Sequence, residues 1–340
     1  MMKKKYTAAP ILLFFILALL VAGCGQSKST SEGNAASASP SASTEPSAAT
    51  TAPTSAAADS EELTITHKLG EIKLKKNPAK VVVFDFGTLD TLDKLGVEVT
   101  GLPKSNLPSY LDKYKDDKYE SVGGLMEPDF EKINALKPDL IIISGRQQTS
   151  YEEFAKIAPT LFVSVDANAY MSSFKENVTL LGQIFGKESE AAAEVTKLTD
   201  AAAKLKEENV NSGKKGLIVL TTGGKVSAYG PGSRFGIIHD ELGVAPVDTE
   251  IKADTHGQSI SFEYVAEKNP DYLFVVDRDA VVASDGASPA KSVVENDLVK
   301  KTNAYKNGKI IYLDPNYWYL SGGGLLSVEE MIKEVSNGVK

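Results

Sequence analysis

The stretch DFEKINALKPDLIIISGR, residues 129–146, decides the fold, because it recurs as SFEYVAEKNPDYLFVVDR at residues 261–278. Each copy opens on an aspartate or serine that favours a helix N-cap, and then runs through Pro-Asp into a short apolar segment. Each copy ends on an arginine, Arg146 or Arg278. We predict a helix–turn–strand unit that occurs twice, with an arginine at the carboxyl end of each strand. Ligands of open α/β sheets bind at that edge.

Short apolar runs alternate with amphipathic stretches through the rest of the folded region. The runs typical of buried strands are residues 81–84, 140–143, 161–165, 217–220, 272–276 and 310–313. The stretches typical of helices are residues 88–95, 130–136, 235–242 and 262–267. This alternation predicts mainly parallel sheets flanked by helices, and therefore an α/β fold.

A long helical pattern lies between the two copies. Residues 187–208 are rich in alanine and leucine and contain no glycine or proline, and a helix of this length would be about 33 Å long. We predict an N-terminal lobe at 61–186, a connecting helix at 187–209 and a C-terminal lobe at 210–340. The expected architecture is two α/β lobes joined by one long backbone helix.

The N-terminal segment predicts export and a lipid anchor. Three lysines precede an apolar run at residues 11–22, and small residues lead to Cys24, which predicts a signal peptide over residues 1–23. The segment resembles a lipobox, which implies lipidation of Cys24; an ordinary signal peptide is the alternative. Residues 24–60 are rich in Ala, Ser, Thr and Pro and predict a disordered tether of roughly 35 Å. Such a tether suits a Gram-positive cell surface.

The arginines are the strongest indication of a binding site. The chain has a net charge of −8 and 37 basic residues, of which only Arg146, Arg234 and Arg278 are arginine. Arginine presents a planar fork of donors that recognises anionic oxygens and stacks on aromatic rings, as lysine does not. We hypothesise that the three arginines converge on one anionic ligand. The alternative is three unrelated surface salt bridges, each worth little.

Histidine and aromatic residues suggest further contacts. His256 lies in a polar loop just before the second copy of the repeat. Trp318, the sole tryptophan, stands between Tyr317 and Tyr319, shortly before a run of three glycines. These rings could cap the core, or they could supply the flat walls of a pocket.

Several function classes are disfavoured by the sequence. We find no P-loop, no dinucleotide-binding glycine motif, no zinc-protease motif and no serine-hydrolase elbow. The acidic balance and the dispersed basic residues argue against nucleic acid. A binding protein is therefore expected, and an enzyme is not.

The folded region resembles the substrate-binding proteins of ferric-siderophore and vitamin B12 ABC importers, whose two lobes are joined by one helix. Over nearly all of residues 61–340 it is more narrowly similar to the petrobactin and catecholate-siderophore binders. The segments that carry the resemblance are FEKI (130–133), SGRQ (144–147), GPGSRFG (230–236), HG (256–257), VDRD (276–279) and YWYL (317–320). The resemblance implies a ferric siderophore as ligand and no intrinsic cofactor.

The resemblance also assigns roles to individual residues. It implies that the arginines neutralise an anionic chelate, and that His256 and Tyr317 bind iron directly only when the chelate leaves two positions open. Trp318 and Tyr319 would support the pocket wall. Glu131 and Glu263, placed alike in the two copies, would dock on arginines of the permease; stabilising their helix N-termini is the simpler alternative.

The predicted function is a monomeric, lipid-anchored receptor on the extracellular face of the membrane. It would bind a ferric siderophore, of the catecholate or mixed catecholate class, and deliver it to an ABC permease with its ATPase. A haem or corrinoid binder is the alternative within the same class. A surface scaffold or adhesin that binds no ligand is the alternative from another class.

Overall fold

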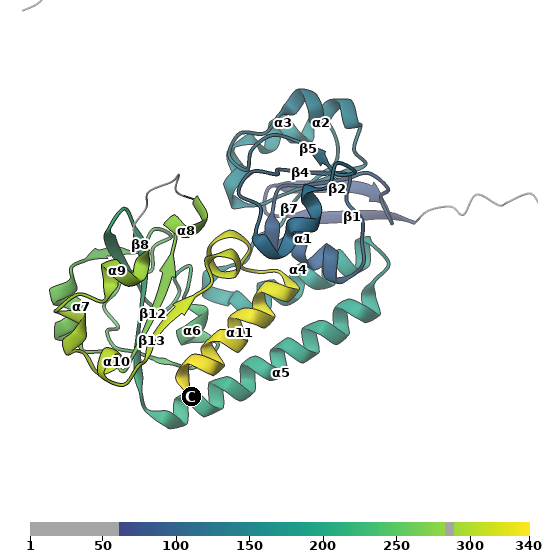
Figure 1. Ribbon diagram of the computed structural model, residues 1–340. Coiled ribbons are helices and arrows are strands. Elements are labelled where there is room, and N and C mark those ends of the chain that lie inside the picture. The colour runs from purple at the N-terminus through teal and green to yellow at the C-terminus, as the bar shows by residue number, and fades with distance from the viewer. Residues whose placement is uncertain (1–60, 283–288) are drawn as a thin grey trace, which may run out of the picture. The chain divides into compact units, whose positions relative to one another are not determined.

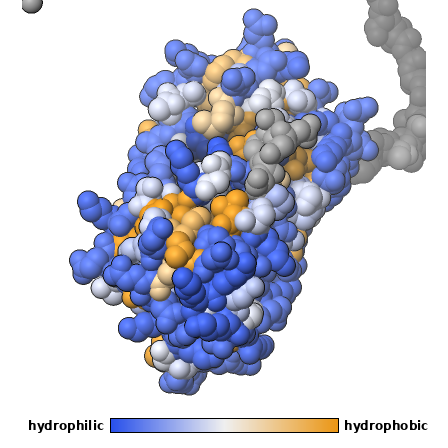
Figure 2. Space-filling view, turned by 60° about the vertical axis from the view of Figure 1, so that its left-hand side comes forward, coloured by the Kyte–Doolittle hydropathy of each residue, from blue (hydrophilic) through white to orange (hydrophobic). Residues whose placement is uncertain are grey.

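The computed structural model describes residues 61–282 and 289–340 (Figure 1). The predicted signal peptide, Cys24 and the tether up to residue 60 lie outside the described residues. The visible face in Figure 2 is largely hydrophilic, with apolar side chains gathered near its middle. Among the described residues, no helix has both the length and the apolar character that a membrane span needs.

The first sheet has five parallel strands in the order β5-β4-β3-β6-β7. The strands are β3 (Val81–Val83), β4 (Gly101–Leu102), β5 (Glu120–Ser121), β6 (Leu140–Ile143) and β7 (Thr160–Phe162). Both β3 and β6 are buried throughout, as expected for strands covered on both faces. The accompanying helices are α1 (Phe86–Lys94), α2 (Phe130–Leu136) and α3 (Tyr151–Ala155), and a hairpin of β1 (Glu62–His67) and β2 (Gly70–Lys75) precedes the sheet.

The second sheet has six strands and is mixed. Strands β8, β12 and β13 run parallel, with β13 at one edge, whereas β9 and β11 are antiparallel additions at the other side and β10 pairs parallel with β8. The strands are β8 (Lys215–Thr222), β9 (Lys225–Tyr229), β10 (Ala245–Pro246), β11 (Gln258–Ile260), β12 (Tyr272–Asp277) and β13 (Ile310–Leu313). Its short helices are α6 (Ile237–Asp240), α7 (Phe262–Lys268), α8 (Asp279–Val282), α9 (Ala290–Val294) and α10 (Asn303–Lys306).

Three long helices pack against one another beside the sheets (Figure 1). They are α4 (Tyr170–Ile184), α5 (Glu188–Ser212) and α11 (Leu325–Val339). The apolar residues of α5 repeat at helical spacing, and Val195 and Leu198 join a core shared with α4 and α11. Helix α5 ends at Gly213, whose positive φ of 65° forms the left-handed cap.

The repeated sequence unit forms the same structure twice. The N-cap side chains of α2 and α7 accept hydrogen bonds from the backbone N–H three residues on. Each helix then ends on a residue with positive φ, Lys137 at 49° and Asn269 at 47°. The aspartate of each Pro-Asp pair accepts backbone N–H groups at the start of the neighbouring strand: Asp139 those of Ala79 and Lys80, and Asp271 that of Lys215.

The predicted α/β class is confirmed, with a long connecting helix between two sheets of mainly parallel strands. All six predicted strands and all four predicted helices are present. The long helix runs three residues beyond the predicted 209. The antiparallel strands β9 and β11 of the second sheet and the helices α4 and α11 were not predicted.

Two matched glycines test how closely the turn after α6 approaches α5. Gly96 and Gly243 each follow a Leu and precede a Val, and both have positive φ (70° and 77°). A Cβ on Gly96 meets no neighbour, whereas one on Gly243 would lie 2.6 Å from the carbonyl oxygen of Lys206 in α5.

We therefore expect Gly96→Ala to lower the free energy of unfolding by about 1 kcal/mol through backbone strain alone. Gly243→Ala should cost at least about 2 kcal/mol, because the α5 backbone must also shift. Urea unfolding of the two variants measures both values. Equal losses would contradict the close approach of α5.

Candidate functional site

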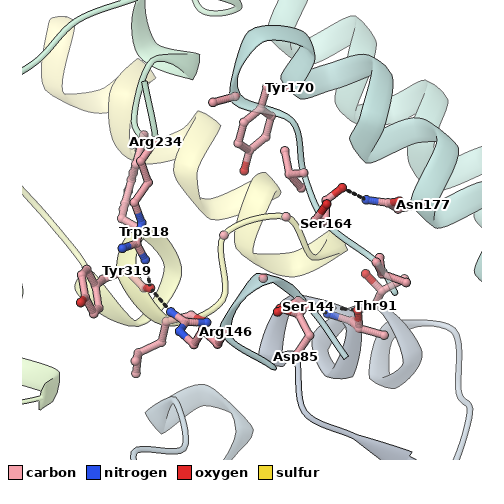
Figure 3. Close-up of a pocket in the computed structure, with 18 of the residues that line it drawn as sticks. Asp85, Thr91, Ser144, Arg146, Ser164, Tyr170, Asn177, Arg234, Trp318 and Tyr319 are labelled. Atoms are coloured by element: carbon pink, nitrogen blue, oxygen red, sulfur yellow. Dashed lines mark hydrogen bonds between the residues drawn. The ribbon is translucent and has the colours of Figure 1, made fainter. Parts of the chain in front are cut away.

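A cavity of about 560 Å³ opens where the carboxyl ends of the strands meet the loop after β13 (Figure 3). Its lining comes from both halves of the folded chain. Residues 85, 144–146 and 163–165 follow β3, β6 and β7, and residues 234, 255–256, 318–320 and 322–323 come from the second half. The volume lies within the range that small-molecule sites occupy.

All three arginines converge on one residue, Tyr319. Its carbonyl oxygen accepts hydrogen bonds from Nη2 of Arg146 (3.0 Å) and Nη2 of Arg234 (2.5 Å). Its hydroxyl accepts one from Nε of Arg278 (2.9 Å). The guanidinium carbon of Arg234 also lies 4.2 Å from the centre of the Tyr319 ring, within cation–π range. The structure thus brings the three arginines together on Tyr319; that they converge on one anionic ligand stays a prediction.

Local structure explains how three distant arginines reach the same tyrosine. Arg278 directly follows β12, and Arg146 lies three residues after β6; these are the strands of the repeated unit. Arg234 lies in a glycine-rich turn where Gly232 has a φ of 66°. Tyr319 sits in a single π-helical turn, Asn316–Leu320, just after β13. Such turns are frequent at functional sites.

Arg146 and Arg234 keep their positive charge without a carboxylate partner among the described residues. Among the described residues, the one ion pair of an arginine joins Arg278 to Asp279 at 3.6 Å. Burial lowers the pKa of Arg234, and the nearby charge of Arg146 lowers it further. Burial alone would raise the pKa of Tyr319, but the hydrogen bond from Arg278 and the arginine charges lower it overall. An anion entering here would find charge-assisted donors ready.

The arginines divide into two kinds. Arg146 and Arg234 line the cavity. Arg278 is not among the lining residues, and its guanidinium is held by Tyr319, Asp279 and the hydroxyl of Thr222. In the structure, Arg278 holds the hydroxyl group of Tyr319 in place and does not itself line the cavity.

The aromatic residues of the YWY segment have separate positions. Trp318 is 2% exposed, lines the cavity with its remaining surface, and donates from Nε1 to Glu334 at 2.7 Å. Tyr317 is not among the lining residues, and its ring packs on Tyr110 with centroids 4.7 Å apart. His256 lines the cavity and is exposed. The structure therefore brings His256, but not Tyr317, to the cavity.

Iron ligation by His256 and Tyr317 stays a prediction. The described residues contain no group of three or more His, Cys, Asp or Glu side chains that could hold a metal ion by themselves. An iron site here would need most of its ligands from a chelator. Tyr317 would also have to leave Tyr110.

Glu131 and Glu263 lie away from the cavity. Each is exposed in the first turn of its helix, α2 or α7. Hydrogen bonds at the start of α7 lower the pKa of Glu263, so this side chain stays charged. Their equivalent places follow from the repeated unit, and docking remains a prediction.

Sequence reasoning missed the polar residues at the other end of the cavity. Figure 3 shows Asp85, Thr91, Ser164 and Asn177 away from Tyr319, with Ser144, two residues before Arg146, beside Asp85. Asp85 follows strand β3 as Arg146 follows β6, so the rule that revealed the arginines could have revealed this aspartate too.

The contact between Trp318 and Glu334 gives a pH-dependent signal. Burial raises the pKa of Glu334 to about 7, from an ordinary value of 4.5. We expect the fluorescence of Trp318, the only tryptophan, to change with a midpoint near pH 7. Glu334→Gln should abolish the transition. Glu330→Gln, one turn earlier on α11, should preserve the transition but lower its midpoint, because the charge of Glu330 helps to raise the pKa of Glu334.

The same carboxyl group affects stability. Because its folded pKa lies above its unfolded value, the folded state holds the proton more tightly, and the free energy of unfolding falls as pH rises from about 4.5 to about 7. Glu334→Gln should flatten this part of the stability profile. A fluorescence midpoint that persists in Glu334→Gln would contradict the assignment.

Comparison with known proteins places the chain in a family. The model of the periplasmic binding protein family matches residues 81–317. The petrobactin-binding protein YclQ of Bacillus subtilis is 48% identical over 98% of both chains. Its crystal structure superposes with a TM-score of 0.80, at 54% identity over 82% of this chain and 99% of that one.

Two further relatives come from Vibrio species. The ferric-anguibactin-binding protein FatB of Vibrio anguillarum is 34% identical over 81% of this chain and 87% of its own. The catecholate-siderophore binding protein VctP of Vibrio cholerae superposes with a TM-score of 0.78, at 39% identity over 82% of this chain and all of that one. The chain therefore belongs to the periplasmic binding protein family.

Proposed function

We propose that the protein is an extracytoplasmic receptor for a ferric siderophore of the catecholate or mixed catecholate class, which it delivers to an ABC permease. The observation that carries the proposal is the convergence of Arg146, Arg234 and Arg278 on Tyr319. It creates a fixed, positively charged end in a cavity large enough for a small chelate. Three relatives are named for the binding of petrobactin, ferric anguibactin and catecholate siderophores, and these names support the same ligand class.

The chemistry of the ligand fits this end of the cavity. Ferric ion is a hard cation that prefers anionic oxygen donors, so its catecholate complexes carry net negative charge. Guanidinium groups bind such oxygens with strong, directional hydrogen bonds. Arg146 and Arg234 would contact the chelate, and Arg278 would act through Tyr319.

The proposal also assigns roles in iron coordination and in the aromatic wall of the cavity. His256 and Tyr317 would complete the iron coordination only for a tetradentate chelate, with Tyr317 swinging away from Tyr110. Trp318 and Tyr319 would form the wall beside the arginines. One face of the Tyr319 ring is already covered by Arg234 and Trp318 is nearly buried. This leaves little flat aromatic surface for a haem or corrinoid ring and favours the smaller chelate.

The cellular setting completes the proposal. Lipidation of Cys24 would anchor the protein to the extracellular face of the cell membrane, in a Gram-positive organism, with residues 24–60 as tether. Glu131 and Glu263 would dock a monomeric receptor on the permease and its ATPase. The exposed positions of both glutamates at helix N-termini support this role. The protein would carry out no chemical reaction.

Fluorescence titration of the soluble domain tests the proposal. Trp318 lines the cavity, so a bound ferric chelate should quench it. We expect saturable quenching by ferric petrobactin and a ferric bis-catecholate at submicromolar concentration, and none by a ferric hydroxamate, haem or vitamin B12. Quenching by haem or B12 alone would overturn the ligand class. If none of these five ligands quenched the fluorescence of Trp318, the result would indicate a scaffold or adhesin that binds no ligand.

A pair of substitutions separates charge from geometry at the arginine end. Arg234→Lys keeps the charge but loses the planar fork that bonds the Tyr319 carbonyl and stacks on its ring. It should weaken ferric bis-catecholate binding by more than tenfold, about 1.4 kcal/mol. Arg234→Met should weaken it further.

Lys300→Met serves as the control, because it removes one positive charge from an exposed side chain far from the cavity lining. Its affinity should match that of the unsubstituted protein. Equal effects of Arg234→Met and Lys300→Met would mean that only net charge matters.

A further inference from the structure

The cavity has two ends of opposite chemistry (Figure 3). Arg146 and Arg234 stand at one end, beside Tyr319. The other end, away from Tyr319, is lined by the carboxylate of Asp85 and by hydroxyl and amide groups, among them Thr91, Ser164 and Asn177. The lining residues include no lysine, and both of their arginines lie at the first end. A ligand that fills the cavity therefore meets cations at one end and a carboxylate at the other.

The carboxylate of Asp85 is held in place and only partly used. Asp85 directly precedes α1 and caps it: Oδ1 accepts from the backbone N–H of Thr88 (2.7 Å) and from its hydroxyl (3.0 Å). Within residues 61–282 and 289–340, no hydrogen bond or ion pair engages Oδ2 of Asp85. The side chain is half-buried. Because the capping hydrogen bonds already fix its conformation, a ligand that binds it causes little further loss of conformational entropy.

A carboxylate in this position opposes the charge of the predicted chelate. A purely anionic ligand that reached Asp85 would be repelled, since like charges at short range raise the free energy of the complex. A ligand with a protonated amine would instead donate a hydrogen bond to an acceptor with full negative charge. The oxygen atoms of the nearby hydroxyl groups would accept hydrogen bonds from its other N–H groups. The arrangement favours a ligand that is itself bipolar.

We infer that Asp85 selects chelates that carry an alkylammonium group, by binding the protonated amine at the end of the cavity opposite the arginines. The inference rests on the proposed function, because the arginine end must hold the anionic ferric head. Asp85 is then a specificity-determining residue: it discriminates between chelates with the same iron-binding groups but different arms. Its capping of α1 continues alongside this role.

Two probes that differ in one charge test the inference. The first is the ferric complex of a linear bis-catecholamide with a pendant primary amine, and the second is the same complex with that amine acetylated. The variant is Asp85→Asn, because asparagine caps a helix as well as aspartate does and still presents an oxygen to Thr88. The matched control is Asp129→Asn, which changes the equivalent cap of α2 outside the cavity.

We expect the unsubstituted protein and Asp129→Asn to bind the amine probe about tenfold more tightly than the acetylated probe. Asp85→Asn should lose that preference by binding the amine probe more weakly, with a thermal midpoint close to the original. A preference unchanged in Asp85→Asn, or no preference in the unsubstituted protein, would overturn the inference while leaving the proposed function intact. Failure of both probes to bind would overturn the proposed function as well.

Discussion

The site depends on holding three guanidinium groups close together against their mutual repulsion. Tyr319 achieves this with three different parts of one residue: the carbonyl oxygen for Arg146 and Arg234, the ring face for Arg234 and the hydroxyl for Arg278. None of these partners carries the full negative charge that would neutralise the arginines. The positive charge therefore remains available to an anionic ligand. Burial and the neighbouring charge of Arg146 make the charged form of Arg234 less favourable, and its pKa is lowered accordingly.

The loop that carries Tyr319 is itself anchored from two sides. Trp318 donates to Glu334 of α11, and the N-terminus of α11 donates two backbone N–H groups, from Leu326 and Ser327, to the buried carboxylate of Asp90 on α1, both at 2.7 Å. A carboxylate at a helix N-terminus is favoured by the helix dipole, although burial raises the pKa of Asp90 to about 6. These bonds join α1 of the first half to α11. They therefore set where Tyr319 and the three arginines that it binds lie relative to Asp85.

Much of this arrangement was predictable from the sequence because it follows from local rules. The repeated unit at residues 129–146 and 261–278 predicted two helices, two strands and an arginine after each strand, and all of these are present. The two-residue strands β4 and β5 were not predictable, because they are too short to show a pattern. The convergence on Tyr319 and the packing of Tyr317 on Tyr110 depend on contacts between distant segments, and composition and spacing do not encode them directly.

A crystal structure with a ferric bis-catecholate, recorded at the iron absorption edge, tests the central claim most directly. The account predicts one anomalous iron peak inside the cavity, with catecholate oxygens within hydrogen-bonding distance of Arg146 and Arg234 and Tyr319 still bonded to Arg278. An iron peak outside the cavity, or a bound chelate whose oxygens contact neither Arg146 nor Arg234, would contradict it.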